Sequence, residues 1–205
     1  MMASPEASQL DRDAIRQTFG LDKPLWEQYA IFMSHAVRLD FGQSFLTGQP
    51  AMHLILERAP ATLELACVAM LMAVLVGVPL GMLAGLRPTA VSSRGIMTGS
   101  VLGFSLPNFW VGLMLIMVFA VQLGWVPAGG RGDVAYLGPF DLSVLTGDGW
   151  THILLPALTI ALAKAALLIR VTRAATREAL PMDYIKFARA KGLAWGRILR
   201  VHLLK

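Results

Sequence analysis

Residues 62–86 read TLELACVAMLMAVLVGVPLGMLAGL, and the 22 residues between Glu64 and Arg87 carry no charge. At about 1.5 Å of rise per residue, about 20 apolar residues in a helix cross the hydrocarbon core of a membrane. The stretch therefore predicts a transmembrane helix near residues 63–86. The alternative, a helix buried in the core of a soluble protein, is a poor fit because the same pattern recurs along the chain.

Two further stretches have this character. Residues 95–130, 36 in all, are uncharged, and residues 149–169 hold a single charge, Lys164. They predict transmembrane helices near residues 96–123 and 152–170.

The composition agrees with a membrane protein. Hydrophobic residues make up 56% of the chain and charged residues 15%, with a mean hydropathy of +0.60. A soluble domain has about 45–50% apolar and about 25% charged residues, so this composition excludes a disordered chain and a coiled coil. The one cysteine, Cys67, excludes an internal disulfide scaffold. We expect an all-α, polytopic transmembrane helical protein whose membrane region covers residues 62–170.

The net charge of +5 is distributed unevenly. Residues 1–60 and 124–151 each carry a net −2, the loop 87–94 holds two arginines and no acid, and residues 170–205 carry a net +7. Basic segments that flank membrane helices remain in the cytoplasm. This rule places residues 1–61 outside, as an extracytoplasmic helical segment. The basic tail carries no nucleic-acid recognition motif, so we expect no nucleic-acid partner.

The first predicted span combines small residues with a proline. Gly77, Gly81 and Gly85 recur every four residues, which allows another helix to approach closely. Pro79 lies between them and weakens the hydrogen-bond ladder. The pattern indicates either a general packing face or a hinge in a moving helix. Glu64, at the outer end of this span, lies where water or lipid head groups can reach it, and we expect a solvated or a capping carboxylate.

The second and third predicted spans carry polar residues at membrane depth. Ser105, Pro107 and Asn108 interrupt the second span, and Lys164 lies well inside the third. A broken helix in a membrane often marks a transport pathway, although Ser105 and Asn108 can instead bond to the freed backbone groups. Lys164 either extends to the inner surface or has an inward-facing polar role. These four residues are the candidates for a translocation path or gate.

Enzyme motifs are absent from the sequence. It has no GxxxxGK loop for a nucleotide, no Ser-x-x-Lys, no Gly-x-Ser-x-Gly and no HExxH motif. No second His, Cys or acid follows His152 at ligand spacing, so the sequence gives a metal site only weak support. We therefore expect no catalytic residues, no cofactor and no metal, and any ATP that drives this protein must be hydrolysed by another chain.

The tail reads as two short basic helices joined by a turn. Asp183 or Pro181 begins the first, Gly192 ends it, and Trp195 lies on the second. Binding of anionic lipid head groups and ordinary solubility charge are two explanations of the basic residues. The glycine turn between two amphipathic helices favours a third, a shaped docking surface.

The tail also carries a family resemblance. Asp183-Tyr184-Ile185 followed by ARAKGL at 188–193 resembles the cytoplasmic coupling loop of ABC importer permeases, and most of all the dipeptide, oligopeptide and nickel branch, to which glutathione permeases also belong. Lys186 and Phe187 stand where the general family has Glu and Ala. The other motifs that resemble this branch are, in chain order, GLDKPL (20–25), DFG-x-S (40–44), ER-x-PATLEL (57–65), SLP-x-FW (105–110), GW-x-P (124–127) and LPALT (155–159).

The resemblance implies a type I ABC importer permease fold, of which this chain would hold about three of six spans, as a fragment. It implies a multi-pass protein of the bacterial inner membrane that works with a second permease subunit, cytoplasmic ATPase subunits and an extracytoplasmic solute-binding protein. Residues 171–205 would then be the coupling loop, truncated. Peptides are the favoured cargo, and glutathione-like thiols and chelated nickel stay open. A secondary transporter or channel fragment is the alternative. The residues that the resemblance assigns to coupling with the ATPase are Asp183, Tyr184, Ile185, Phe187, Ala188, Arg189, Ala190, Lys191 and Gly192.

Overall fold

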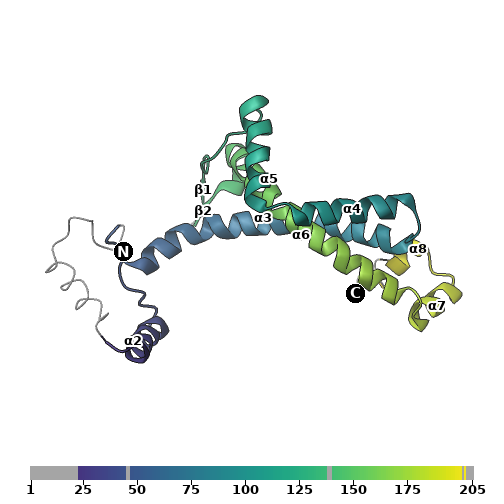
Figure 1. Cartoon of the computed structure of the whole chain (residues 1–205), viewed down its shortest axis with the longest axis horizontal. Coiled ribbons are helices and arrows are strands. Elements are labelled where there is room, and N and C mark those ends of the chain that lie inside the picture. The colour runs from purple at the N-terminus through teal and green to yellow at the C-terminus, as the bar shows by residue number, and fades with distance from the viewer. Residues whose placement is uncertain (1–22, 45–46, 138–139, 200, 202–205) are drawn as a thin grey trace. The chain divides into compact units, whose positions relative to one another are not determined.

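The computed structural model in Figure 1 describes residues 23–44, 47–137, 140–199 and 201. The chain divides into two compact units, Met1–Pro60 and Ala61–Lys205. The first part of the predicted extracytoplasmic segment, including residues 20–22 of the GLDKPL motif, lies outside the described residues.

The described part of the first unit contains helix α2, Leu25–Val37. Pro24 precedes its first turn, where a missing N–H costs nothing because the first helical N–H groups have no intrahelical partner. Lys23 forms an ion pair with Glu27 at 2.9 Å. After the helix, Asp40 accepts hydrogen bonds from His35 at 3.0 Å and from the N–H of Gly42 at 3.0 Å. These bonds fix the turn that follows α2.

Helix α3, Ala51–Leu86, contains the first predicted span but begins 12 residues before residue 63. Pro60 and Pro79 both lie within it. Each proline removes one main-chain hydrogen bond, to the carbonyl four residues earlier, and the rest of the helical ladder is long enough to continue past the gap. The helix is therefore longer than the apolar run that predicts it.

Helix α6, Gly147–Ala179, contains the third predicted span and extends it at both ends. Thr146 caps the helix by accepting a hydrogen bond from the N–H of Gly149 at 3.0 Å. Beyond residue 170 the same helix carries Arg173 and Arg177. Its basic end is thus a continuation of the apolar span, with no loop between them.

Small residues bring α3 and α6 together, as Gly77, Gly81 and Gly85 predict. A Cβ atom on these glycines would lie 2.7, 2.7 and 2.6 Å from the Cβ atoms of residues 168, 172 and 176 of α6. Alanines 73, 161 and 165 continue this seam as a buried cluster. The glycine face is therefore a helix–helix contact, and its partner is α6.

The second predicted span is not one straight helix. Helix α4, Val91–Ser105, is followed by helix α5, Asn108–Leu115, which continues as a π-helical segment, Ile116–Gln122. The two halves are bent by 99° at Leu106-Pro107. Figure 1 shows α4 running beside α6, and α5 bent sharply away from the direction of α4. Pro107 cannot donate to the ladder, and Leu106 adopts the extended conformation that precedes a proline. The predicted interruption is present, and the single helix over 96–123 is replaced by this bent pair.

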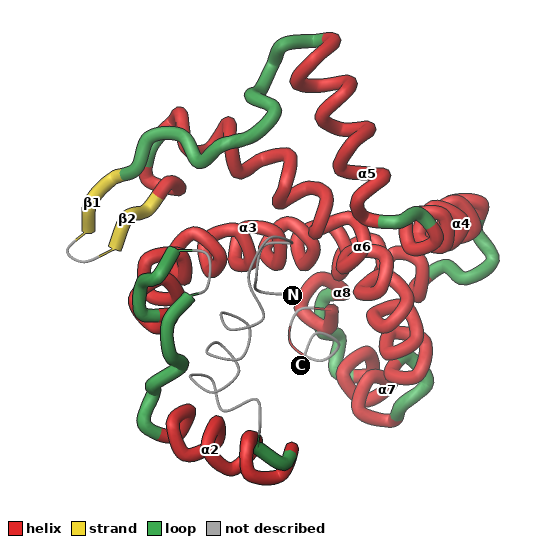
Figure 2. Tube along the Cα trace, turned by 60° about the vertical axis from the view of Figure 1, so that its left-hand side comes forward, coloured by secondary structure: helices red, strands yellow, loops and turns green. Residues whose placement is uncertain are grey.

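A short β-hairpin follows, which no sequence pattern predicts. Strands β1, Ala135–Leu137, and β2, Phe140–Leu142, pair antiparallel, with Tyr136 opposite Asp141. A 3₁₀ turn, Ser143–Leu145, connects β2 to α6. Figure 2 shows the two strands as the small exception in a helical structure, and the all-α transmembrane class is confirmed.

Among the described residues, α3 and α6 are long and apolar enough to cross a membrane, and the bent α4–α5 pair is a third candidate if it counts as one broken span. After α6 the chain forms two short helices, α7, Asp183–Ala190, and α8, Trp195–Ile198.

Candidate functional site

The α7–α8 hairpin has its own small core. Ile185, Ala188 and Ile198 are buried together, with 0%, 3% and 1% of their surface exposed, and Leu193 packs against them. An amphipathic helix of only eight residues is marginal in water by itself. The hairpin is therefore stabilised by the burial of these apolar side chains between its two helices.

Gly192 forms the turn that joins the two helices. Its φ is +73°, in the left-handed region, and a Cβ atom at this position would have no heavy atom of the described residues within 4 Å. The N–H of Leu193 bonds to the carbonyl of Ala188 at 3.2 Å, and the N–H of Gly192 bonds to the carbonyl of Arg189 at 2.9 Å. This pair of bonds is a Schellman motif, which glycine favours because of its backbone conformation.

The outer face of the hairpin carries aromatic rings and cations. Tyr184 and Phe187 are 50% and 61% exposed. The guanidinium of Arg189 lies 4.4 Å from the ring centre of Trp195, and the ammonium of Lys191 lies 4.5 Å from that of Phe187. These contacts hold the cations over the rings at the surface.

The structure separates the residues that the resemblance assigns to coupling into two groups. Ile185 and Ala188 are buried, so they support the hairpin and cannot contact a partner directly. The exposed ones are Asp183, Tyr184, Phe187, Arg189, Ala190, Lys191 and Gly192. An i, i+3 ion pair between Asp183 and Lys186 at 2.9 Å lies at the start of α7. The sequence does not predict the contact of Arg189 with Trp195, because a cation–π pair across a turn has no local sequence signature.

The residues predicted for a translocation path do not gather in one place. The Ser105 hydroxyl donates to the carbonyl of Val101 at 2.8 Å, within its own helix. Pro107 precedes α5 as its N-cap, and Asn108 is the first residue of that helix. Lys164 is exposed on α6. Asn108 also lines a cavity of which Ser105, Pro107 and Lys164 are not lining residues.

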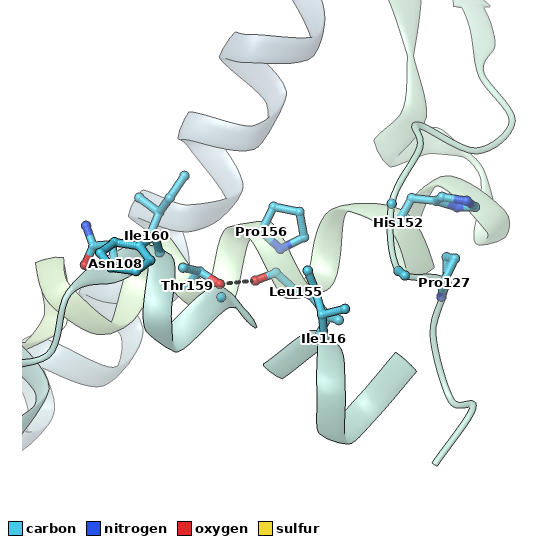
Figure 3. Close-up of a pocket in the computed structure, with 12 residues that line it drawn as sticks. Asn108, Ile116, Pro127, His152, Leu155, Pro156, Thr159 and Ile160 are labelled. Atoms are coloured by element: carbon cyan, nitrogen blue, oxygen red, sulfur yellow. Dashed lines mark hydrogen bonds between the residues drawn. The ribbon is translucent and has the colours of Figure 1, made fainter. Parts of the chain in front are cut away.

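That cavity, of about 340 Å³, lies between α5, α6 and the segment that follows the π-helical turn. Its walls are mostly apolar, with polar side chains at Asn108, His152 and Thr159 (Figure 3). The lining residues are Asn108, Phe109, Gly112, Ile116, Pro127, Ala128, Gly129, His152, Leu155, Pro156, Thr159 and Ile160.

His152, which lines this cavity, carries two hydrogen-bond acceptors. His152 Nδ1 lies 3.0 Å from the carbonyl oxygen of Asp148, which can only accept, so Nδ1 carries the proton and Nε2 is the acceptor in the neutral ring. Pro156 has no N–H, so the carbonyl of His152 lacks its helical donor. The Thr159 hydroxyl donates to the carbonyl of Leu155 at 2.8 Å, the dashed line in Figure 3.

A buried carboxylate connects α3 to the segment after the cavity. The side chain of Glu64 is 5% exposed, and neither of its oxygens has a hydrogen-bond partner among the described residues. Arg131 Nη2 lies 3.8 Å from Glu64 Oε2. Arg131 also donates to Ser143 Oγ at 3.2 Å and to the carbonyl of Asp141. Glu64 is thus buried beside a cation, and not solvated as its position in the sequence indicates.

No group of three His, Cys, Asp or Glu side chains in the described ranges is arranged to hold a metal ion. The described residues thus present an exposed surface of aromatic and basic side chains on the α7–α8 hairpin and a cavity between α5 and α6.

Comparison of the sequence with known proteins identifies the family of the chain. The sequence profile described as "Binding-protein-dependent transport system inner membrane component" matches residues 77–205. The chain is 38% identical to the di/tripeptide transport system permease protein DppB of Pseudomonas aeruginosa (strain UCBPP-PA14) over 96% of this chain and 62% of that protein.

Two further relatives cover the whole chain. It is 38% identical to the oligopeptide transport system permease protein AppB of Bacillus subtilis (strain 168), over 63% of that protein. It is 36% identical to the glutathione transport system permease protein GsiC of Escherichia coli (strain K12), over 62% of that protein. The chain therefore spans a little over three fifths of the length of these relatives. With the profile matched from within α3 to the last residue, the chain belongs to the family of binding-protein-dependent transport system inner membrane components.

Proposed function

We propose that this chain is the transmembrane permease subunit of an ATP-binding cassette importer that moves peptides or similar small solutes across the bacterial inner membrane. Separate ATPase subunits supply the energy, and the chain itself catalyses no reaction. The observation that carries the proposal is the α7–α8 hairpin, a self-supported basic surface that directly follows a membrane-length helix. Relatives named as peptide and glutathione permeases support the choice of cargo.

The hairpin has the properties of a docking element. Its exposed rings, Tyr184 and Phe187, supply the apolar contact area, and aromatic residues often dominate interface energies. Arg189 and Lys191 are held over rings, so little side-chain freedom remains to be lost on binding. We expect the partner, a cytoplasmic ATPase subunit, to offer an apolar groove with an acidic rim.

Helix α6 transmits the motion of this hairpin toward the cavity. Its 33 residues make a rod of about 50 Å at the usual helical rise. The close contact of α6 with Gly77, Gly81 and Gly85 forces α3 to move with it. Closure of two ATPase subunits on ATP would thus shift both helices together and change access to the membrane interior. A second permease subunit and an extracytoplasmic solute-binding protein complete the proposed assembly.

Co-purification and transport test the proposal. The chain is expressed together with the other components encoded for its transport system, purified, and reconstituted in liposomes. We expect an ATPase subunit to co-purify, ATP hydrolysis to rise with the loaded binding protein, and peptide uptake to stop with vanadate but not with an ionophore. Uptake that an ionophore abolishes and vanadate leaves unchanged would instead indicate an ion-driven transporter.

A further inference from the structure

The cavity between α5 and α6 has a shape and a chemistry that docking to an ATPase does not explain. Its volume, about 340 Å³, lies at the lower end of the range of about 300–1,000 Å³ that small-molecule sites occupy. Such sites are mostly apolar with a few polar groups that fix orientation. This cavity matches that description, and its chemistry indicates which part of a cargo it would hold.

Two polar side chains, those of Asn108 and His152, lie on opposite sides of the cavity, and the third, Thr159, lies between them with its hydroxyl bonded to the carbonyl of Leu155. Figure 3 shows Asn108 on one side of the cavity and His152 on the other, with Leu155, Pro156 and Ile160 between them. A ligand that fits must be apolar in its middle and polar at both ends.

The two polar ends differ in what they can bind. On the side of His152, Nε2 of the neutral ring and the main-chain carbonyl can accept hydrogen bonds, so a ligand that reaches either atom would offer an N–H or ammonium group. At the other end the Asn108 side chain, which has no hydrogen-bond partner among the described residues, can both donate and accept. The main chain of a peptide carries both kinds of group on either side of each side chain.

We propose that this cavity is a subsite for an apolar side chain of a peptide in transit, with main-chain groups of the peptide bonded to His152 and Asn108. The inference rests on the proposed function, because it assumes that peptides pass through this chain. Its content goes further: the membrane subunit itself, and not its partners alone, favours peptides with leucine-sized side chains.

Filling the cavity is the direct test. Gly112 lines it, and a Cβ there would lie 3.4 Å from Thr159 Cγ2, an ordinary contact, so we expect the side chain added by Gly112→Leu to reduce the volume of the cavity. Gly99 on α4 is the matched control, since no described heavy atom lies within 4 Å of its Cβ position and it does not line the cavity. Uptake of dileucine and of dialanine is measured in the reconstituted transporter with saturating binding protein.

We expect Gly112→Leu to lower the ratio of dileucine to dialanine uptake at least about tenfold, the usual effect of lost space in an apolar pocket. Gly99→Leu should leave the ratio unchanged, and Gly112→Ala should give a smaller shift in the same direction as Gly112→Leu. If the ratio of dileucine to dialanine uptake is unchanged in Gly112→Leu, the proposed subsite is wrong, even if the uptake of both peptides falls equally.

A labelling experiment keeps this test independent of transport. In a Cys67→Ser background, Gly112→Cys is treated with a water-soluble maleimide in the assembled transporter. We expect labelling that excess dileucine slows several-fold and dialanine does not, and Gly99→Cys to show no such protection. If the reagent does not label Gly112→Cys at all, the cavity is covered by lipid or by another helix, and the proposed subsite is wrong. If the unmodified transporter shows no ATP-dependent uptake of either peptide, this result counts against the proposed function alone. The subsite is still tested, because protection of residue 112 from labelling is measured without transport.

Discussion

Replacing Gly81 by alanine tests whether the contact of α3 with α6 depends on the absence of a side chain. A Cβ at this position would lie 2.7 Å from Thr172 Cβ and 2.8 Å from the carbonyl oxygen of Ile169. Carbon atoms in contact lie about 3.5–4.0 Å apart, so the two helices must separate by roughly 1 Å. The carbonyl belongs to the backbone of α6, so a change of rotamer cannot relieve the contact.

Two effects of opposite sign determine the size of the change. Overpacking of a close contact costs about 1–3 kcal/mol, while alanine in place of glycine stabilises a helix by up to about 1 kcal/mol. We therefore expect Gly81→Ala to lower the stability by about 1–2 kcal/mol, which in a chain of this size lowers the melting temperature by about 2–8 °C. Gly99→Ala receives the helix-propensity gain without the clash, because the space at its Cβ position is open.

The assay is thermal unfolding of the purified chain in lipid nanodiscs, followed by tryptophan fluorescence. The order of melting temperatures, from highest to lowest, should be Gly99→Ala, then the unmodified chain, then Gly81→Ala. A melting temperature for Gly81→Ala at or above that of Gly99→Ala would refute the reasoning, since it would mean that α3 and α6 are not in this contact.

Three further predictions concern other parts of the chain. Gly192→Ala should reduce substrate-stimulated ATP hydrolysis while the binding protein still loads peptide, because a left-handed residue with a Cβ costs about 1–2 kcal/mol; Gly192→Asn, which tolerates that conformation, should retain most of the activity. Arg131→Met should destabilise the chain by about 1–3 kcal/mol, because it leaves the buried Glu64 carboxylate without its neighbouring cation. The loss is smaller than for a fully buried pair because Arg131 is 35% exposed, and adding Glu64→Gln should restore part of it in the same unfolding assay. The hydrogen bond from His35, together with that from Gly42, lowers the pKa of Asp40 in the folded chain. The ionised Asp40 therefore stabilises the fold at a pH above its unfolded-state pKa, and this stabilisation is lost as the pH falls through the lowered folded-state pKa. In His35→Ala, an NMR titration should find the pKa of Asp40 closer to its ordinary value.

Local chemistry made part of this structure readable from the sequence. Uncharged runs predict α3 and α6 because the cost of burying a charge in lipid acts on each stretch independently. Pro107 predicts the break between α4 and α5 for a similar reason, since a missing N–H and a constrained preceding residue are properties of two neighbouring positions. The Gly192 turn and the recurrence of glycine along α3 are likewise local signals, and both features are present.

Contacts between distant segments depended on the tertiary structure. The glycine pattern shows that one face of α3 lacks side chains and allows close packing, but only the tertiary structure identifies α6 as the helix that packs against this face. The tail pattern groups Ile185 with Tyr184 as apolar residues of one helix, and the return of α8 onto α7 decides that Ile185 is buried and Tyr184 exposed. The position of Glu64 at the end of a span predicts a solvated carboxylate, yet it is buried beside Arg131, 67 positions further along the chain. Hydrophobicity and backbone preference act residue by residue, whereas burial and ion pairing are set by which surfaces the folded chain brings together.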